Sequence, residues 1–152
     1  MSCHALGVDP LTSSTFHSTV CLFAANILWT VIYDTIYAHQ DVKDDVKAGA
    51  MSMAVRFKDS TKTLTSILAV AMVLLLLTTG ALTDMSLVYF VITCGGTAIS
   101  LAAMIGLVDL ESPDSCAWWF KWDFWFVGGS MVCGLLGEYF QKLSQMKGGW
   151  SF

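Results

Sequence analysis

Apolar residues along this chain gather in long blocks that are separated by shorter polar stretches. The four blocks cover residues 16–38, 64–83, 86–108 and 118–140. A helix of about 20 apolar residues crosses the hydrocarbon core of a bilayer, so each block predicts one membrane-spanning helix. The middle two blocks contain no charged residue, whereas the last carries charges near both of its ends. We therefore expect an all-α fold, a transmembrane helical bundle of about four spanning helices, forming a single membrane domain over residues 1–152.

The connections between the blocks differ in length and charge. Residues 39–63 form a long charged loop, and residues 109–117 form a second polar loop. Between the second and third blocks, Asp84 and Met85 form a tight turn. With four spans, both long loops lie on the same side of the membrane. Six of the eight Lys and Arg residues belong to that side, and the positive-inside rule places such a side in the cytosol or an equivalent compartment.

The composition supports a membrane protein and excludes several other classes. Hydrophobic residues make up 55% of the chain and charged residues 13%, whereas a soluble domain carries about a quarter charged residues. No basic stripe with interleaved aromatic residues occurs, so we expect the lipid bilayer as a partner and no nucleic acid. The five cysteines include no CxxC spacing, which argues against a zinc site. No basic segment precedes an early apolar run, so we expect no cleaved signal peptide.

The residues with recognisable chemistry lie where the first block ends. Asp34, Asp41 and Asp45 are spaced seven and four residues apart, which places all three on one face if the first helix continues through them. Such carboxylates repel one another unless a divalent cation neutralises them, and Mg²⁺ binds carboxylate and water oxygens while bridging to substrate phosphates. An acidic group at membrane depth, such as Asp34, is costly unless it serves a site. The alternative is an ordinary solvated loop, because short acidic motifs often occur without function.

Short segments around these acids carry a family resemblance. They read YDTIYAHQD at 33–41, DDVKAG at 44–49 and SMAVRF at 52–57. Together they resemble the second aspartate-rich motif, with its flank, of the UbiA superfamily of intramembrane prenyltransferases. The sequence of these segments is most similar to eukaryotic 4-hydroxybenzoate polyprenyltransferases. Among those it is most similar to the fungal branch that farnesylates aromatic polyketides in meroterpenoid synthesis. The segment SPDSCAWWFKWDFWFVGG at 112–129 resembles the last loop and helix of that branch, so the resemblance covers residues 16–140.

The resemblance implies a fold and a reaction. Members form a nine-helix bundle in which two aspartate-rich motifs bind Mg²⁺ ions that hold a prenyl diphosphate, and an aromatic acceptor attacks the allylic cation formed by ionisation. Asp41 and Asp45 match the metal-binding, catalytic aspartates, Asp34 matches an acidic residue one helical segment earlier, and Lys47 matches a basic position near the diphosphate. We therefore expect a Mg²⁺-dependent transfer of a prenyl group, with farnesyl favoured. The fungal resemblance also favours an endomembrane, such as the endoplasmic reticulum, over the mitochondrial inner membrane.

Three neighbouring residues have roles that the sequence leaves more open. Tyr37 either walls the prenyl pocket or anchors the helix at the membrane interface. Arg56 meets either the diphosphate or a lipid phosphate. We include both among the expected substrate-binding residues. His39 we interpret as a polar residue at the membrane surface, because Mg²⁺ rarely takes imidazole as a ligand.

Two features depart from the family pattern. Met51 stands where many relatives have a basic residue, and the first motif of the family, NDxxDxxxD, does not follow Asn26, the single asparagine. Relatives also have close to twice this length, so the chain resembles the C-terminal four helices of the bundle and implies a missing N-terminal half as a partner. The alternative functions are a catalytically incomplete membrane subunit or remnant, and a UbiA-type terpene cyclase, which ionises the same substrates without an aromatic acceptor.

Overall fold

The computed structural model describes residues 13–49, 55 and 60–148, and every regular element within them is helical. The expected all-α fold is therefore confirmed for this part of the chain. The elements, in chain order, are α2 (Ser13–Tyr37), the 3-10 turn η1 (Ala38–Gln40), α3 (Val42–Ala48), α5 (Thr61–Leu82), α6 (Leu87–Tyr89), the π-helical segment η3 (Phe90–Gly95), α7 (Gly96–Leu107) and α8 (Pro113–Gly148).

Three of the predicted spans are confirmed as helices that are long and apolar enough to cross a membrane. They cover Thr15–Tyr37, Thr61–Leu82 and Leu87–Leu107. The fourth predicted span lies inside α8, a continuous helix of 36 residues. Because α8 also carries charged residues and several tryptophans, its mean hydropathy is lower, and it is not among the three. The fourth crossing therefore stays a prediction.

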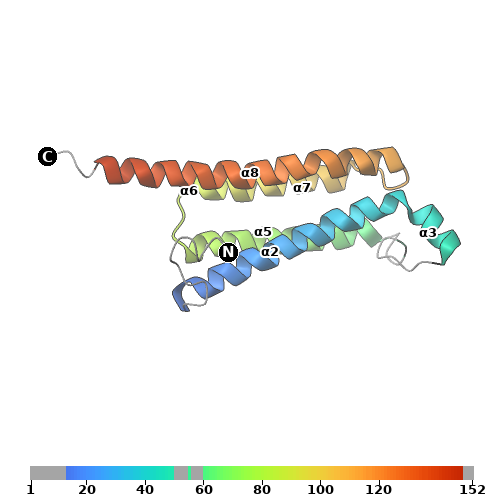
Figure 1. Cartoon of the computed structure of the whole chain (residues 1–152), viewed down its shortest axis with the longest axis horizontal. Coiled ribbons are helices and arrows are strands. Elements are labelled where there is room, and N and C mark those ends of the chain that lie inside the picture. Colours follow the sequence, from blue (N-terminus) through green and yellow to red (C-terminus); the bar gives the residue numbers. More distant parts are fainter. Residues whose placement is uncertain (1–12, 50–54, 56–59, 149–152) are drawn as a thin grey trace.

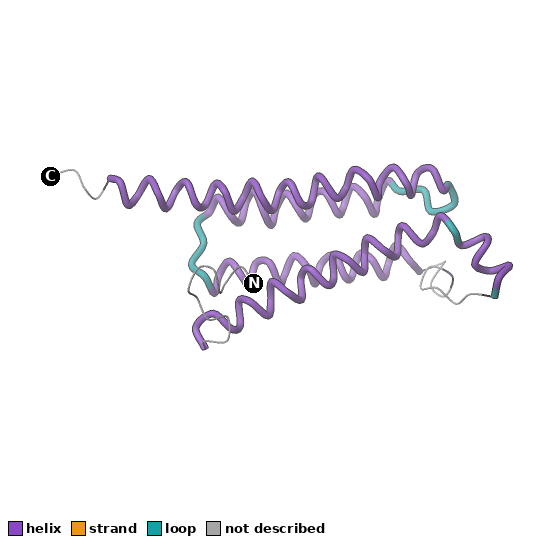
Figure 2. Tube along the Cα trace, in the orientation of Figure 1, coloured by secondary structure: helices purple, strands orange, loops and turns teal. Residues whose placement is uncertain are grey.

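The helices form two layers, as Figure 1 shows. In one layer α2 packs along α5, and in the other α7 packs along α8. The C-terminal end of α2 and the link from α7 to α8 lie at the same end of the bundle, which we call the loop end (Figure 2). This arrangement agrees with the prediction that the two polar loops start from the same side of the bundle.

The side chains sort as expected for a bundle surrounded by lipid. The contact between the helices buries Ile32, Met72, Leu76, Leu101, Met104 and Val127. Large apolar side chains such as Phe23, Ile67 and Ile99 point outward and are mostly exposed. A soluble monomer rarely leaves so much contiguous apolar surface uncovered, so these faces suit the hydrocarbon of a bilayer.

The predicted tight turn between the second and third spans is present. Asp84 adopts a left-handed conformation with φ 48°, and the amide of Met85 donates to the carbonyl of Gly80 at 3.0 Å. This bond is part of a Schellman motif, the common way to end a helix. The chain then returns through α6, where the Tyr89 hydroxyl donates to the Leu76 carbonyl at 3.1 Å.

Small residues permit the close packing of α8 against the third span. A Cβ atom added at Gly134 would overlap Thr93, and one added at Gly96 would lie 2.7 Å from the Ser130 Cβ. Such close approach of glycine-bearing faces is a common packing mode between helices in lipid. The neighbouring segment η3 is π-helical and contributes the buried Thr93.

Candidate functional site

The first helix does not continue through the acidic motif. α2 ends at Tyr37, the 3-10 turn η1 follows, and Asp41 has φ −104° and ψ 3°, outside the helical region. A separate helix, α3, then begins at Val42 and leaves the bundle at an angle, as Figure 1 shows. It ends at Gly49, whose φ of 72° suits a glycine because other residues rarely adopt it. The condition under which all three acids would share one helix face is therefore not met.

The helix break separates Asp34 from the other two acids. Asp34 lies on the last turn of α2 and is exposed, whereas Asp41 is the N-cap of α3 and Asp45 lies one turn later. The amide of Asp45 donates to the carbonyl of Asp41 at 2.8 Å, so these two residues do share one turn of helix. Among the described residues, no three His, Cys, Asp or Glu side chains are grouped closely enough to hold a metal ion.

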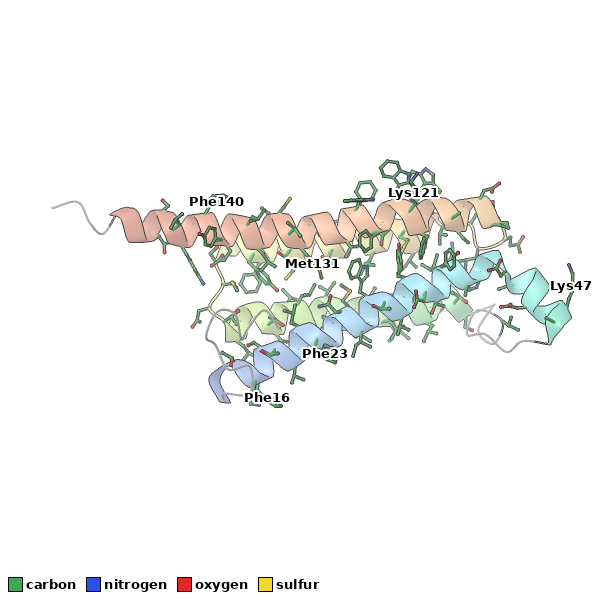
Figure 3. All side chains as sticks on the ribbon, viewed as in Figure 1. Phe16, Phe23, Lys47, Lys121, Met131 and Phe140 are labelled. Carbon is green, nitrogen blue, oxygen red and sulfur yellow. The ribbon has the colours of Figure 1, made fainter. Side chains whose placement is uncertain are left out.

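The predicted diphosphate-binding residues lie in different places. Lys47 is exposed on the last turn of α3, and Figure 3 shows it projecting from the far end of that helix, away from the bundle. Tyr37 is half-exposed at the end of α2. Arg56 lies outside the described residues.

Aromatic rings from α2 and α8 interleave beside the loop end. Trp29 stacks on Phe124 with ring centroids 5.5 Å apart, and Tyr33 stacks on Phe120 at 4.1 Å. Tyr37 also packs against Phe120, with ring centroids 4.2 Å apart and tilted by 40°. The α2 rings recur every four residues, as do the α8 rings, so each set lies along one helix face. We call these five residues the aromatic ladder.

A buried carboxylate lies beside the ladder. Asp123 on α8 is completely buried, and neither of its carboxylate oxygens has a hydrogen-bond partner among the described residues. Tyr33 lies within electrostatic range of Asp123. The Trp29 indole N–H is also buried without a partner in the described structure. Asp123 is one of the charges near the ends of the last apolar block, to which the sequence assigned no role; an ionisable residue in such a block is the available signal.

His39 connects the two ends of the long loop. Its Nδ1 lies 2.8 Å from the carbonyl of Thr35, which can only accept, so Nδ1 carries the proton. In the neutral ring Nε2 then accepts from the Thr61 hydroxyl at 3.2 Å. His39 is buried in the protein, and its contact with Thr61 closes a loop of more than twenty residues; its position at the level of the membrane surface stays a prediction.

A polar cleft of about 590 Å³ opens at the loop end. It is lined by His39, Lys62 and residues 106–111, which include Asp109 and Glu111. None of the predicted site residues that the structure describes lines it. The predicted acids and this cleft therefore lie at the same end of the bundle but do not form one site.

Comparison with known proteins identifies a family. A sequence model of the UbiA prenyltransferase family matches residues 7–128. The 4-hydroxybenzoate polyprenyltransferase, mitochondrial, of Schizosaccharomyces pombe is 44% identical over 100 residues, which are 66% of this chain and 28% of the relative.

Two further relatives extend over more of the chain. The 4-hydroxybenzoate geranyltransferase 1 of Lithospermum erythrorhizon is 41% identical over 78% of this chain and 38% of its own length. The UbiA prenyltransferase claS of Ampulloclitocybe clavipes is 38% identical over 80% of this chain and 39% of its own length. The chain thus spans 28 to 39% of these three relatives. No solved structure matches.

Proposed function

Because this chain belongs to the UbiA prenyltransferase family, we propose that it takes part in the transfer of a prenyl group from a prenyl diphosphate to an aromatic acceptor. The names of two relatives include 4-hydroxybenzoate together with a polyprenyl or a geranyl group. The observation that carries the proposal is the pair Asp41 and Asp45 on one turn of α3, at the end of the bundle where the aromatic ladder begins.

The donor set suits Mg²⁺ in the presence of a diphosphate. Mg²⁺ is usually bound through one or two carboxylates, several waters and substrate phosphate oxygens rather than by an all-protein cage. Asp41 makes no capping bond with its side chain, and both it and Asp45 reach solvent. Asp34 is the proposed third ligand, and Lys47 is a proposed contact to the diphosphate. Both roles require α3 to fold back toward α2, because Asp34 lies on α2 and Lys47 points away from the bundle. A bound Mg²⁺ supplies positive charge that stabilises the leaving diphosphate.

The aromatic ladder supports the same reaction from the membrane side. Ionisation of an allylic diphosphate produces a carbocation, which water would destroy. Stacked rings exclude water, and their π-faces attract cations. Tyr37 ends the ladder near the acids, which favours its role as a wall of the prenyl pocket over a pure interface anchor. Arg56 stays a proposed diphosphate or lipid-phosphate contact.

The finer assignment rests on the resemblance to the fungal branch. We propose farnesyl as the prenyl group, a polyketide or hydroxybenzoate-type acceptor, a place in meroterpenoid synthesis and an endomembrane location. The relatives differ on these points, because their names include polyprenyl and geranyl groups and, for the one from Schizosaccharomyces pombe, a mitochondrion. Fractionation of a tagged chain against endoplasmic reticulum and mitochondrial markers decides the location.

One assay tests the reaction. Membranes that contain this chain, alone or together with the N-terminal half of the Lithospermum relative, receive Mg²⁺, 4-hydroxybenzoate and geranyl, farnesyl or a longer polyprenyl diphosphate. The second form is included because the resemblance implies a first aspartate-rich motif on a separate half. We expect a prenylated acid, with farnesyl diphosphate as the best donor. Product is measured by mass spectrometry.

The other outcomes identify the alternatives. A cyclic hydrocarbon without prenylated acid would indicate a terpene cyclase. If neither form yields product with any donor, the chain is a non-catalytic membrane subunit, and the proposed reaction is wrong. Omission of Mg²⁺ with EDTA is expected to abolish product in the form that is active.

A further inference from the structure

Two buried carboxylates on α8 differ in how they are held. Glu138 accepts hydrogen bonds from the Ser86 amide at 2.9 Å and from the Ser86 hydroxyl, and its Oε1 lies 3.3 Å from Lys142 Nζ. Asp123 is buried at least as deeply and has no partner in the part of the chain that the structure describes. At Glu138 the fold therefore supplies two hydrogen-bond donors and an ion pair. Asp123 lacks that support.

An unpaired buried carboxylate is costly, because burial removes its hydration without replacing it. Residues that break a stability rule in this way are most often found at functional sites. A second unsatisfied group lies at the same level of the interface, since Trp29 stacks on Phe124, the neighbour of Asp123. The indole N–H of Trp29 is a donor without an acceptor, whereas Asp123 is an acceptor without a donor.

The surroundings restrict what such a group can bind. The aromatic ladder offers flat apolar faces, and Tyr33 and Phe120 stack beside Asp123. A phenol matches this environment, because its ring can join the stack while its hydroxyl both donates and accepts. The ladder is open at its edge, since Phe124 and Tyr37 are 46% and 43% exposed. Rotation of exposed rings can therefore admit another ring.

We propose that Asp123 binds the hydroxyl group of the aromatic acceptor and so positions the acceptor ring within the aromatic ladder. This inference rests on the proposed function for the nature of the ligand. The acceptor hydroxyl donates to the Asp123 carboxylate, and the Trp29 N–H supplies a second contact to the hydroxyl oxygen. The site lies within the bundle, whereas the acids Asp41 and Asp45 lie at the loop end, so donor diphosphate and acceptor ring approach from different directions.

The test is a binding experiment with the full chain in lipid nanodiscs. Binding of 4-hydroxybenzoate is compared with binding of benzoate, which lacks the hydroxyl and is smaller, for the wild type, Asp123→Asn and Asp123→Leu. A hydrogen bond to a charged group predicts that the wild type prefers the hydroxylated acid by about tenfold or more. In Asp123→Leu this preference should disappear while benzoate affinity is unchanged, and Asp123→Asn should fall between them.

Glu138→Gln is the matched control on the same helix. It should keep the preference for 4-hydroxybenzoate but lower the thermal unfolding midpoint, because it removes the charge that Ser86 and Lys142 satisfy. Asp123→Leu should keep or raise the midpoint, because no protein partner is lost. These opposite effects on stability separate a binding role from a structural one.

The outcomes of binding and transfer are distinguishable. If the wild type shows no preference, or if Asp123→Leu keeps it, the inference is overturned even where prenyl transfer occurs. If the preference depends on Asp123 but no form yields prenylated product, the inference stands and the proposed function fails. Where transfer is measurable, Asp123→Leu should raise KM for the acceptor and leave KM for the prenyl diphosphate unchanged.

Discussion

The Nε2 atom of His39 accepts a hydrogen bond from the Thr61 hydroxyl at 3.2 Å, which joins the end of the first spanning helix to the start of the second. The same ring donates from Nδ1 to Thr35 at 2.8 Å. Two residues that are 22 positions apart are thus held together inside the structure. The long charged loop begins and ends at this buried contact.

Replacing His39 with Ala should loosen the loop end. The change removes two buried hydrogen bonds and leaves the Thr61 side chain without the imidazole, a loss of about 1–3 kcal/mol in the free energy of unfolding. The measurement is thermal or denaturant unfolding in detergent, with limited proteolysis of the loop as a second readout. The control is His17→Ala, which removes an exposed histidine on α2. Equal stability of the two variants would contradict the assignment.

Replacing Asp41 or Asp45 with Asn should abolish Mg²⁺-dependent prenyl transfer in membranes that are active with the unchanged chain, whether or not they need the added N-terminal half. Each change removes one charged oxygen ligand while keeping the shape of the side chain, and we expect a loss of about 100-fold or more in turnover. Both side chains reach solvent, so stability should change by less than about 0.5 kcal/mol.

The matched control for these acids is Asp114→Asn, an exposed acid at the start of α8, also at the loop end. It should retain full turnover and unchanged dependence on Mg²⁺ concentration. If Asp41→Asn behaves like Asp114→Asn, the acid pair is not the metal site.

Replacing Gly134 with Ala should destabilise the contact between α8 and the third span. The added Cβ would overlap Thr93, and such overpacking costs about 1–3 kcal/mol. Gly129→Ala on the same helix is the matched control, because nothing lies within 4 Å of its added Cβ. Since alanine is a better helix former, Gly129→Ala should be neutral or stabilising by up to about 1 kcal/mol. Equal midpoints for the two variants would show that the helices do not approach at Gly134.

The Cys116 thiol should react slowly with maleimide. It is fully buried at the start of α8, and burial, followed by the nearby charge of Asp109, raises its pKa. A raised thiol pKa lowers the reactive thiolate fraction at any given pH, so modification should require a higher pH than for an ordinary thiol. An exposed cysteine at position 114, in Asp114→Cys, should react at least about tenfold faster at pH 7. Comparable rates would contradict the buried placement.

The sequence predicted the spanning helices well, because block length and lack of charge are physical requirements of a bilayer. The second block was expected at 64–83 and the helix covers Thr61–Leu82. The turn at Asp84 was also correct, since only two residues, Asp84 and Met85, lie between the apolar blocks and leave room for nothing longer. The fold class and the family followed from these blocks and from the motif at 33–57.

The sequence left open whether the first helix continues through the acids, because no local signal marks the break before α3. Residues 34–48 contain neither glycine nor proline, so helix propensity alone favours continuation. The turn coincides with the contact of His39 to Thr61, a tertiary interaction between distant positions. Asp123 was passed over for a similar reason. In lipid both faces of a helix are apolar, so the pattern does not reveal which side of α8 meets the aromatic rings of α2.

The π-helical segment η3 sets the rotational phase of the third span. Tyr89, Thr93, Thr97, Leu101 and Ile105 are all buried and recur at intervals of four. In a regular α-helix each such step turns the side chain about 40° further round the axis. The wider π turn uses more residues per revolution and offsets that drift, so all five keep facing the neighbouring helices. Deleting one residue between 90 and 95 would convert the wide turn to a regular α-helical turn and leave Thr97, Leu101 and Ile105 facing the same way, whereas deleting one between 98 and 100 would turn Leu101 and Ile105 by about 100° around the helix axis.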